Sequence, residues 1–534
     1  MKTPIVDYVR QYNESDTVRA HMPGHKGTAF LGFEGLDITE IKGADYLYFA
    51  DGIIEESEEN ATKLFDTGRT VYSTEGSSQC IKAMLYLALL NHKKKGSSKR
   101  PYILAARNAH ASFIHALALL DLDVKWLWPE NGAENVWGNE KDAERCRTNI
   151  SSICNCIVSG QQLEVTLNSL SEPPAAVFVT SPDYLGGVMD IEVLSKVCHK
   201  HGTILLVDNA HGAYLNFLDS TRYSKYKHPI QCGADICCDS AHKTLPVLTG
   251  GAYLHISKAL TDEAECVKYA LALFGSTSPS YLILQSLDLC NRYLADGYKE
   301  KLSECCKRME NLKFKLSDMG YGIIDSDPLR LTVRLYSDYE SEERVTLSGN
   351  ELADLLRKEG VECEYSDDEF VVMMLTDCNK DEDFERILSA LEVIKVRDIQ
   401  GTGKNCLLSG SDSVKDEDSC FCDAKGTKGK RHPSEAAAVG MSVTDPFDSE
   451  LKNVKAVMTV RNAVFALHER VPVEKALGRI CAAPAIACPP AISIAVPGER
   501  IDEVLIRNFK RYHIESVEVV KKNESKAKVV KVLC

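Results

Sequence analysis

The chain has 534 residues, of which 44% are hydrophobic and 26% are charged, and its formal net charge is -14. This length exceeds one ordinary core, so two to four domains are expected in a soluble globular protein. The negative charge argues against nucleic-acid binding. No apolar stretch is long enough to span a bilayer and residues 1–4 begin no signal peptide, so we expect no membrane association and a cytoplasmic location.

The 20 cysteines are scattered through apolar runs or stand in adjacent pairs. Because no secretory signal is present, reduced structural thiols are a better interpretation than disulfides. Cys154-x-Cys156 and Cys420-x-Cys422 contain a residue type that binds zinc, but no matching Cys or His pair follows at zinc-site spacing. We therefore predict no metal site.

Residues 1–65 are rich in Gly, Asp and aromatic residues, which indicates an irregular N-terminal arm with short helices. Residues 66–299 alternate between expected strands and expected helices. Strands are expected at 72–74, 102–105, 176–180, 203–208 and 234–238, and helices at 79–90, 111–120 and 191–201. Continuous apolar strands between helices predict an α/β domain whose mainly parallel sheet is covered on both faces.

Residues 300–398 have the pattern of a smaller α+β domain. Alternation at 330–335 predicts a half-exposed strand, followed by a helix at 349–358, a strand at 369–375 and a helix at 382–393. Residues 399–438 contain too few apolar side chains to offset the entropy of ordering, so we predict a flexible linker. Residues 439–534 form a third unit, with a helix at 502–509 and strand-like alternation at 517–532.

Lys243 follows Ser240 and His242, directly after the expected strand 234–238. A lysine in a desolvated or electrostatically perturbed site loses its proton and becomes nucleophilic. This placement suits a Schiff-base lysine that holds pyridoxal phosphate (PLP). By itself, the pattern Ser-x-His-Lys is more often a surface lysine after a strand, so the remaining requirements of the cofactor decide between the two interpretations.

PLP also needs an anion for its ring nitrogen, a cradle for its phosphate and a group stacked on its ring. Asp208 ends the expected strand 203–208, the end at which ligands bind in open α/β sheets, and its carboxylate would keep the ring nitrogen protonated. A helix N-cap is the structural alternative for an Asp at this position. The joint occurrence of Asp208 and Lys243 at two strand ends favours the cofactor role.

The turn Gly76-Ser77-Ser78 lies between a strand and a helix, and its N–H groups and hydroxyls match a phosphate site at a helix N-terminus. A simple capping turn is the alternative. Ser240 and His242 would complete the cradle from the lysine loop.

Two histidines follow expected strands. His110 comes after the strand 102–105, where an imidazole can stack on the PLP ring, although a histidine in a loop is more often exposed or hydrogen-bonded. His211, three residues after Asp208, is a weaker candidate for contact with cofactor or substrate.

Together these motifs resemble the Orn/Lys/Arg decarboxylase family, in its shorter bacterial branch. The matching segments keep the order of the family and lie at 21–26, 74–78, 107–110, 207–212, 240–243, 276–281, 478–480 and 489–499. The resemblance implies an α/β large domain of PLP fold type I (aspartate-aminotransferase-like), a small α+β domain and a C-terminal α+β domain.

The resemblance also implies roles for individual residues. It implies that Lys243 carries the cofactor, that Asp208 contacts the ring nitrogen and that His110 stacks on the ring. Residues near the phosphate would be Ser77, Ser78, Ser240 and His242. The segment 276–278, with Thr277 and Ser278, would lie at a dimer interface and reach the phosphate of the partner subunit, so a homodimer or an assembly of dimers is expected.

Two positions depart from the family pattern, which more usually has Glu where Asn209 stands and Gly where Ala491 stands. Asn209 need not affect the chemistry, because Asp208 is retained. Ala491 lies near the expected substrate-facing C-terminal loop, so it puts the identity of the substrate more in doubt than catalysis.

The implied reaction is decarboxylation of arginine, lysine or ornithine to the amine and CO2, as in polyamine biosynthesis, with a proton delivered to Cα by Lys243 or His242. Arginine is slightly preferred from the resemblance alone. Glu499 is a candidate for binding the distal cation, with an exposed loop carboxylate as the alternative. An aminotransferase or lyase, with Arg334 as a carboxylate clamp or as a solvated strand residue, and a non-catalytic regulator are the competing hypotheses.

Overall fold

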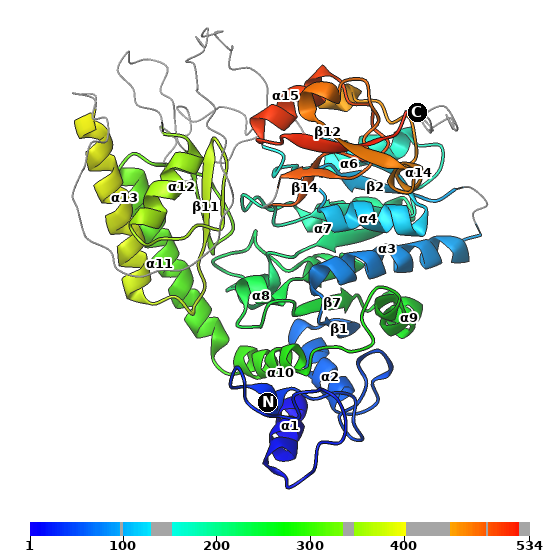
Figure 1. Cartoon of the computed structure of the whole chain (residues 1–534), viewed down its shortest axis with the longest axis vertical. Helices are drawn as coiled ribbons and strands as arrows, with labels where there is room; N and C mark the ends of the chain where they lie inside the picture. The colour runs from blue at the N-terminus through cyan, green and yellow to red at the C-terminus, as the bar shows by residue number, and fades with distance from the viewer. Residues whose placement is uncertain (97–99, 130–151, 335–346, 402–448, 488–489, 523–534) are drawn as a thin grey trace, which may run out of the picture.

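Figure 1 shows the computed structural model of the chain, in which residues 1–96, 100–129, 152–334, 347–401, 449–487 and 490–522 are described. The predicted linker lies outside the described residues from position 402 on, as do Cys420, Cys422 and the expected alternation beyond residue 522. In these ranges, no helix is both long enough and apolar enough to cross a bilayer.

A seven-stranded sheet forms the centre of the molecule, in the order β1-β7-β6-β5-β4-β2-β3. Its strands are β1 (Arg69–Ser73), β2 (Tyr102–Ala106), β3 (Asp123–Leu127), β4 (Ala176–Thr180), β5 (Ile204–Asp208), β6 (Ile236–Asp239) and β7 (Ala252–Ile256). Only β7 runs against both of its neighbours, β1 and β6, and the pairs from β6 to β3 are parallel. The predicted mainly parallel sheet is confirmed.

Both faces of this sheet are buried, which explains the continuous apolar strands. On β4, Phe178 packs into the core beneath α3 (Gly76–Lys94) and α4 (Ala111–Leu120). Its neighbours Val177 and Val179 pack into the core beneath α6 (Gly160–Ser169) and α7 (Ile191–Lys200). Successive side chains point to opposite faces of a strand, so each face needs its own apolar set.

The smaller sheet has four antiparallel strands, in the order β10-β11-β9-β8. Its strands are β8 (Gly322–Ile323), β9 (Arg330–Arg334), β10 (Tyr365–Ser366) and β11 (Phe370–Met374), and its helices are α11 (Tyr298–Asp318), α12 (Gly349–Lys358) and α13 (Asp381–Gly401). A capping box between Ser348 and Glu351 fixes the start of α12, where the helix was predicted.

The half-exposed strand predicted at 330–335 is wrong in its exposure. Arg330 and Thr332 on β9 are both fully buried. Their side chains donate hydrogen bonds to backbone oxygens of the loop after β4: Arg330 Nη1 to Tyr184 O at 2.7 Å, and Thr332 Oγ1 to Leu185 O at 2.7 Å. The polar positions of this strand therefore face the large sheet and not water.

The C-terminal unit lies over the β2–β3 side of the large sheet (Figure 1). It contains β12 (His468–Pro472), β13 (Ala485–Ala487), β14 (Ile492–Ala495), β15 (Ser516–Val520), α14 (Val460–Val464) and α15 (Glu503–Arg511). The buried Arg107 guanidinium donates to Ser493 O and Ile494 O at 2.6 and 2.8 Å, which joins the unit to the end of β2. The helix predicted at 502–509 corresponds to α15.

The N-terminal arm packs at the opposite end of the chain's long axis (Figure 1). It contains α1 (Pro4–Glu14) and α2 (Ile53–Phe65), and the remaining helices of the large unit are α8 (Ala241–Thr244), α9 (Thr261–Ala272) and α10 (Tyr281–Ala295). The buried Asp288 carboxylate on α10 accepts the backbone N–H groups of Ile5 and Val6, and so ties the start of α1 to the core.

Candidate functional site

Lys243 lies on the short helix α8, directly after β6, and its side chain is partly buried. Lys243 Nζ lies 2.8 Å from His211 Nε2. Burial lowers the pKa of Lys243, while the carboxylates of Asp208 and Glu364 oppose that shift. An amine with a lowered pKa is more often neutral, which is the form that can act as a nucleophile or a base.

Asp208 ends β5 and is buried, with 3% of its surface exposed. Its carboxylate accepts a hydrogen bond from Ala210 N at 3.2 Å and contacts the Cys238 thiol at 3.8 Å. Burial raises its pKa, and Lys243 opposes that shift. The N-cap alternative does not hold, because the next helical turn begins at Ala213 with Gly212 as its N-cap.

His211 lies between Lys243 and the loop after β4. Its ring packs edge-on against Tyr184, with ring centroids 5.0 Å apart, and its Nδ1 is buried without a hydrogen-bond partner in the structure. Burial, together with Lys243, holds the pKa of His211 well below its usual range. The imidazole is therefore neutral at neutral pH, and its Nε2 lies within hydrogen-bond distance of Lys243 Nζ.

The predicted phosphate turn forms the first turn of α3. Gly76 has a φ of +70°, and a Cβ placed there would meet no atom within 4 Å, so the backbone of this turn borders open space. The N-cap residue Glu75 makes no side-chain capping bond to the helix. Ser77 Oγ lies 2.7 Å from Ser240 Oγ, so the α3 turn and the lysine loop meet as predicted.

His242 is oriented by Gly251, because its backbone N and its Nδ1 both contact Gly251 O, at 3.3 and 3.1 Å. Burial lowers its pKa. The adjacent Gly250 has a φ of +98°, and a Cβ there would lie 2.9 Å from Thr74 O. Glycine at this turn therefore lets the lysine loop approach the segment that leads into α3.

His110 is the N-cap of α4, because its Nδ1 accepts the backbone N–H of Ser112 at 3.1 Å. Ser112 Oγ also donates to Ser78 Oγ at 2.8 Å, which connects His110 to the α3 turn. Burial, with a smaller contribution from Lys243, lowers the pKa of His110 to about 4. The ring is thus a neutral, partly buried surface within electrostatic range of Lys243.

The C-terminal unit also contacts this region. Ala111 N donates to Ala491 O at 2.9 Å, and His110 forms an isolated β-bridge with Ile492. Ala491 has a φ of +59°, a left-handed conformation that glycine adopts without strain and that is strained for alanine. A glycine at this position would not carry that strain.

Thr277 and Ser278 lie in the exposed loop between α9 and α10. Ser278 N donates to Ser276 Oγ at 3.1 Å, and Ser276 N donates to the Glu75 carboxylate at the start of α3. This loop thus reaches the Gly76 turn from outside, while no contact in the described residues joins Thr277 or Ser278 to Lys243.

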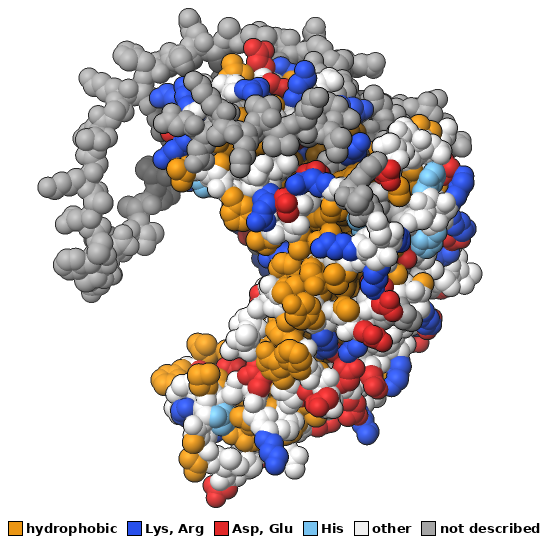
Figure 2. All heavy atoms as spheres, turned by 90° about the vertical axis from the view of Figure 1, so that its right-hand side faces the viewer, with side chains coloured by type: hydrophobic (Ala, Val, Ile, Leu, Met, Phe, Trp, Pro, Cys, Tyr) orange, Lys and Arg blue, Asp and Glu red, His pale blue; other side chains and the backbone are white. Residues whose placement is uncertain are grey.

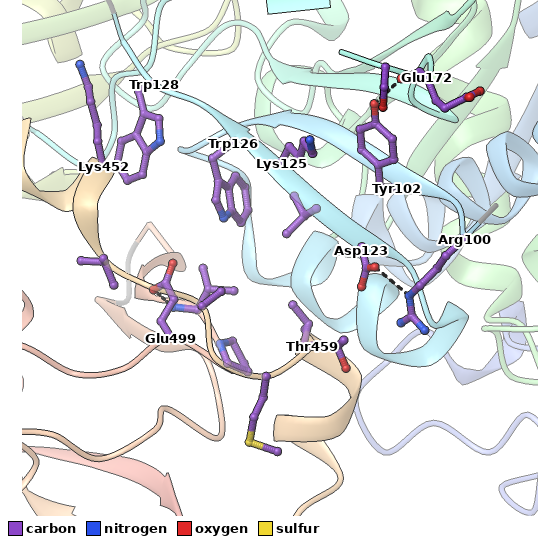
Figure 3. A pocket seen from close by; sticks show the side chains of 18 of the residues that line it. Arg100, Tyr102, Asp123, Lys125, Trp126, Trp128, Glu172, Lys452, Thr459 and Glu499 are labelled. Atoms are coloured by element: carbon purple, nitrogen blue, oxygen red, sulfur yellow. Dashed lines mark hydrogen bonds and ion pairs between the residues drawn. The ribbon is translucent and has the colours of Figure 1, made fainter. Parts of the chain in front are cut away.

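Glu499 lies apart from the Lys243 group. Its buried carboxylate is 3.9 Å from Arg107 Nη2 and accepts Val496 N at 2.8 Å. Glu499 lines a cavity of about 580 Å³ between β3 and the C-terminal unit, whose other lining residues include Trp126 and Trp128 (Figure 3). No other predicted site residue lines this cavity, so its contacts give no support to a distal-cation role for Glu499.

Sequence reasoning missed Arg330, whose guanidinium is buried beside the site. Arg330 Nη1 donates to Tyr184 O, Nε lies 3.2 Å from Asp327 Oδ2, and Nη2 is buried without a hydrogen-bond partner. Arg334, the residue singled out on the same strand, instead pairs with Glu369 at 3.5 Å. The alternation of polar and apolar residues predicted strand β9. Only the contact of Arg330 with Tyr184 shows which of the two arginines lies beside the site.

One buried group of residue types that can bind metals is present in the described residues: His228, Cys237, Asp239 and His255. Both histidine Nε2 atoms lie 3.1 Å from Asp239 Oδ2, so these three side chains already serve as hydrogen-bond partners for one another. The carboxylate between two imidazoles has a pKa well below its usual range, despite its burial. We interpret the group as a structural hydrogen-bond network.

A mainly parallel sheet covered by helices on both faces is the architecture predicted for PLP fold type I, and comparison with solved structures agrees. The chain aligns over 97% of its length with the Francisella novicida lysine decarboxylase LdcF (81% of that chain, TM-score 0.67, 16% identity). It aligns equally with the Escherichia coli constitutive lysine decarboxylase (82% of that chain, TM-score 0.68, 15% identity). At these identities the likeness shows the fold alone, and the predicted fold class is confirmed.

Sequence comparison gives the family. The family model described as "Orn/Lys/Arg decarboxylase, major domain" matches residues 3–326, and that of the C-terminal domain matches residues 445–516. The chain belongs to the Orn/Lys/Arg decarboxylase family, which consists of PLP-dependent amino-acid decarboxylases. Similar proteins include an arginine decarboxylase of Bacillus subtilis (26% identity, 94% of this chain and 92% of the relative) and the uncharacterized B. subtilis protein YaaO (29%, 70% and 74%).

Proposed function

We propose that the protein decarboxylates a basic amino acid, arginine, lysine or ornithine, to the corresponding amine and CO2 with PLP as cofactor. The observation that carries the proposal is the meeting of a lysine of lowered pKa with the buried Asp208, both at the carboxyl ends of adjacent parallel strands. Arginine remains our preferred substrate, because the chain is similar over nearly its whole length to a B. subtilis arginine decarboxylase.

Several features support a PLP site. The turn at Gly76 borders open space, and the N-cap residue Glu75 makes no side-chain hydrogen bond to the first N–H groups of α3, which suits a phosphate. Ser77, Ser78, Ser240 and His242 would surround that phosphate, Asp208 would contact the ring nitrogen, His110 would cover a ring face and Lys243 would hold the cofactor. The bound cofactor supplies the electron sink for the pair left on Cα when CO2 departs.

The chain's own residues would then position the substrate and move its proton. We assign the substrate carboxylate to Arg330, because its Nη2 is buried and has no hydrogen-bond partner. Lys243 Nζ would return a proton to Cα, and His211 Nε2, 2.8 Å away, would keep that amine oriented. Neutral His110 and His211 add no positive charge that would compete with Lys243 for the buried Asp208.

The test measures CO2 release from labelled arginine, lysine and ornithine by the purified protein and by Lys243→Ala. We expect release by the wild type with loss of at least 1000-fold in the variant, together with loss of a visible absorption band from bound cofactor. Lys258→Ala, an exposed lysine that pairs with Asp66, is the matched control and should change neither. Formation of a keto acid instead of CO2 would contradict decarboxylation and indicate an aminotransferase. Absence of any cofactor absorption band would indicate a non-catalytic regulator.

We also propose that the active form is a homodimer. Figure 2 shows hydrophobic side chains gathered on the face where α9 lies in Figure 1. Tyr269 on α9 is 57% exposed, and Leu273, directly after α9, is 46% exposed. Phe49, in the short helix η2 (Leu47–Phe49) that contacts α9, is 71% exposed. Apolar surface of this kind is typical of an interaction site. We expect sedimentation at dimer mass for the wild type and dissociation for Tyr269→Glu, with a monomeric wild type contradicting the proposal.

The remaining sequence predictions stay proposals of the same kind. We propose a cytoplasmic location, an amine product that enters polyamine synthesis, and domains with the boundaries given by sequence: an arm at 1–65, a large domain at 66–299, a small domain at 300–398, a linker at 399–438 and a C-terminal domain at 439–534. Limited proteolysis with mass spectrometry would test these boundaries, and cleavage first within 399–438 is expected.

A further inference from the structure

A short series of contacts leads from the reactive lysine to a carboxylate on the smaller sheet. Lys243 contacts His211, and the His211 ring packs against the ring of Tyr184. The Tyr184 hydroxyl donates to Glu364 Oε1 at 2.7 Å. Glu364 directly precedes β10, the edge strand of the smaller sheet, and the neighbouring Tyr365 ring also packs on Tyr184, with centroids 5.3 Å apart. The smaller sheet therefore holds Glu364 at the end of a series of contacts that begins at Lys243.

The Glu364 side chain is exposed, and within the described ranges no lysine or arginine lies within ion-pair distance of it. Neighbouring carboxylates differ in this respect, because Glu362 pairs with Arg357 at 2.9 Å and Glu369 pairs with Arg511 at 2.6 Å. A neutral hydroxyl orients Glu364 without cancelling its charge. Such a carboxylate is suited to receive a cation from a ligand.

This carboxylate acts electrostatically on the site. Burial lowers the pKa of Lys243 and that of His242, and the Glu364 carboxylate opposes both shifts. Two carboxylates act on Lys243 in this way, and the other, Asp208, is buried at a strand end beneath it. Arg330, which carries the free cationic donor of the site, contacts the backbone oxygen of Tyr184.

We propose that Glu364 binds the distal amino or guanidinium group of the substrate, and thereby selects a basic over a neutral side chain. The inference deepens the proposed function and rests on it. With the α-carboxylate on Arg330 and the reacting bond at Lys243, Glu364 provides the third point of attachment. Tyr184 is a positioning residue, since its hydroxyl holds one carboxylate oxygen and leaves the other for the ligand.

The experiment compares equilibrium binding of 6-aminohexanoate and hexanoate to the holoenzyme by calorimetry. Both carry the carboxylate for Arg330, neither has the α-amine needed for reaction, and they differ only in the distal cation. We expect the wild type to bind 6-aminohexanoate at least tenfold more tightly than hexanoate. Glu364→Gln should abolish this preference while leaving the affinity for hexanoate unchanged.

Glu362→Gln is the matched control, because it removes the same charge two residues away from a carboxylate already paired with Arg357. It should retain the preference, and Tyr184→Phe should weaken it severalfold. In turnover, Glu364→Gln should raise KM for the basic substrate more than it lowers kcat. A preference that survives Glu364→Gln, or that Glu362→Gln removes equally, overturns the inference.

The outcomes also separate this inference from the proposed function. If the wild type releases no CO2 from any basic amino acid, the proposed function fails, whatever the binding preference. If the wild type decarboxylates a basic amino acid and Glu364→Gln leaves both KM and the binding preference unchanged, the reaction stands and the assignment of Glu364 is wrong.

Discussion

Two buried aspartates end adjacent parallel strands, yet their surroundings shift the pKa of the carboxylate in opposite directions. Asp239 at the end of β6 lies between two buried imidazoles, and Asn209 Nδ2 donates to its other oxygen at 2.6 Å. Its pKa is lowered well below the usual range. Asp208 at the end of β5 has one backbone N–H and a thiol as partners, and burial raises its pKa.

The difference teaches how to separate a structural carboxylate from a functional one in the same environment. Burial alone disfavours the charged form of both, so the sign of the pKa shift depends on the partners that the protein supplies. Asp239 has its full set of hydrogen bonds within the chain. Asp208 has fewer partners, the main influence that opposes its raised pKa is Lys243, and a positively charged ring nitrogen would complete its environment.

Within the comparison of the aspartates, the largest expected effect is catalytic and comes from Asp208→Asn. The substitution removes the charge that would keep the cofactor ring able to accept electrons, so kcat/KM for decarboxylation should fall by about 100-fold or more. The free energy of unfolding of the apoprotein should change by less than about 1 kcal/mol, because burial disfavours the charged form and Asp208 has only one backbone N–H and a thiol as partners. Activity within a few-fold of the wild type would remove the distinction between the two aspartates.

Asp239→Asn should have its main effect on stability. Two buried histidines lose their anionic acceptor, which we expect to lower the free energy of unfolding by about 3 kcal/mol at pH 7, measured by urea denaturation. Because the folded-state pKa is lowered, the contribution of Asp239 is present above the ordinary Asp pKa and is lost as pH falls below it. Wild type and variant should therefore converge in acid, and equal stability at pH 7 would contradict the structural role.

A third aspartate extends the comparison to pH dependence. Asp183 is fully buried, one of its oxygens has no hydrogen-bond partner, and burial raises its pKa to about 7. A folded-state pKa above the unfolded value gives stability that is present in acid and is lost as pH rises toward 7. We expect about 2 kcal/mol of this loss between pH 5 and 7, and its absence in Asp183→Asn. Parallel pH profiles for the two proteins would show that another group is responsible.

The smallest expected effect comes from a substitution that changes no carboxylate. It gives a reference for the size of the effects expected at the three aspartates. Ala491→Gly relieves the left-handed conformation beside His110, so the free energy of unfolding should rise by about 0.5–1 kcal/mol. Ala476→Gly, at a φ of -87°, is the control and should lower it instead. Thermal unfolding measures both, and a destabilised Ala491→Gly would mean that the Ala491 methyl packs more favourably than its backbone is strained.

Local patterns were sufficient for much of the fold and part of the site. The apolar run 203–208 and the helix 349–358 lie where they were predicted, because strand burial and helix capping are encoded by neighbours in sequence. Ser77 and Ser240, 163 residues apart, were expected together and lie 2.7 Å apart. Their meeting follows from the rule that ligand-binding turns gather at the carboxyl ends of parallel strands.

Predictions failed where a partner came from another unit of the fold. The alternation of β9 is the same whether its polar side chains face water or a loop, so Arg330 could not be distinguished from Arg334. Glu499 is not tested in this way and stays a prediction, although the sequence could not show that its carboxylate lies 3.9 Å from Arg107 Nη2. Glu364 has no sequence signal, because its importance depends on Tyr184, 180 residues earlier.

By itself, the sequence determined the fold class, the family and the position of Lys243 and Asp208 at two strand ends, since each depends on periodicity or on short motifs. Tertiary structure alone decided which buried charges are satisfied within the chain and which are left for a ligand. The physical reason is that the pKa and the availability of a buried group depend on neighbours brought from distant segments, and Asp208 and Asp239 differ in those neighbours and not in their local sequence pattern.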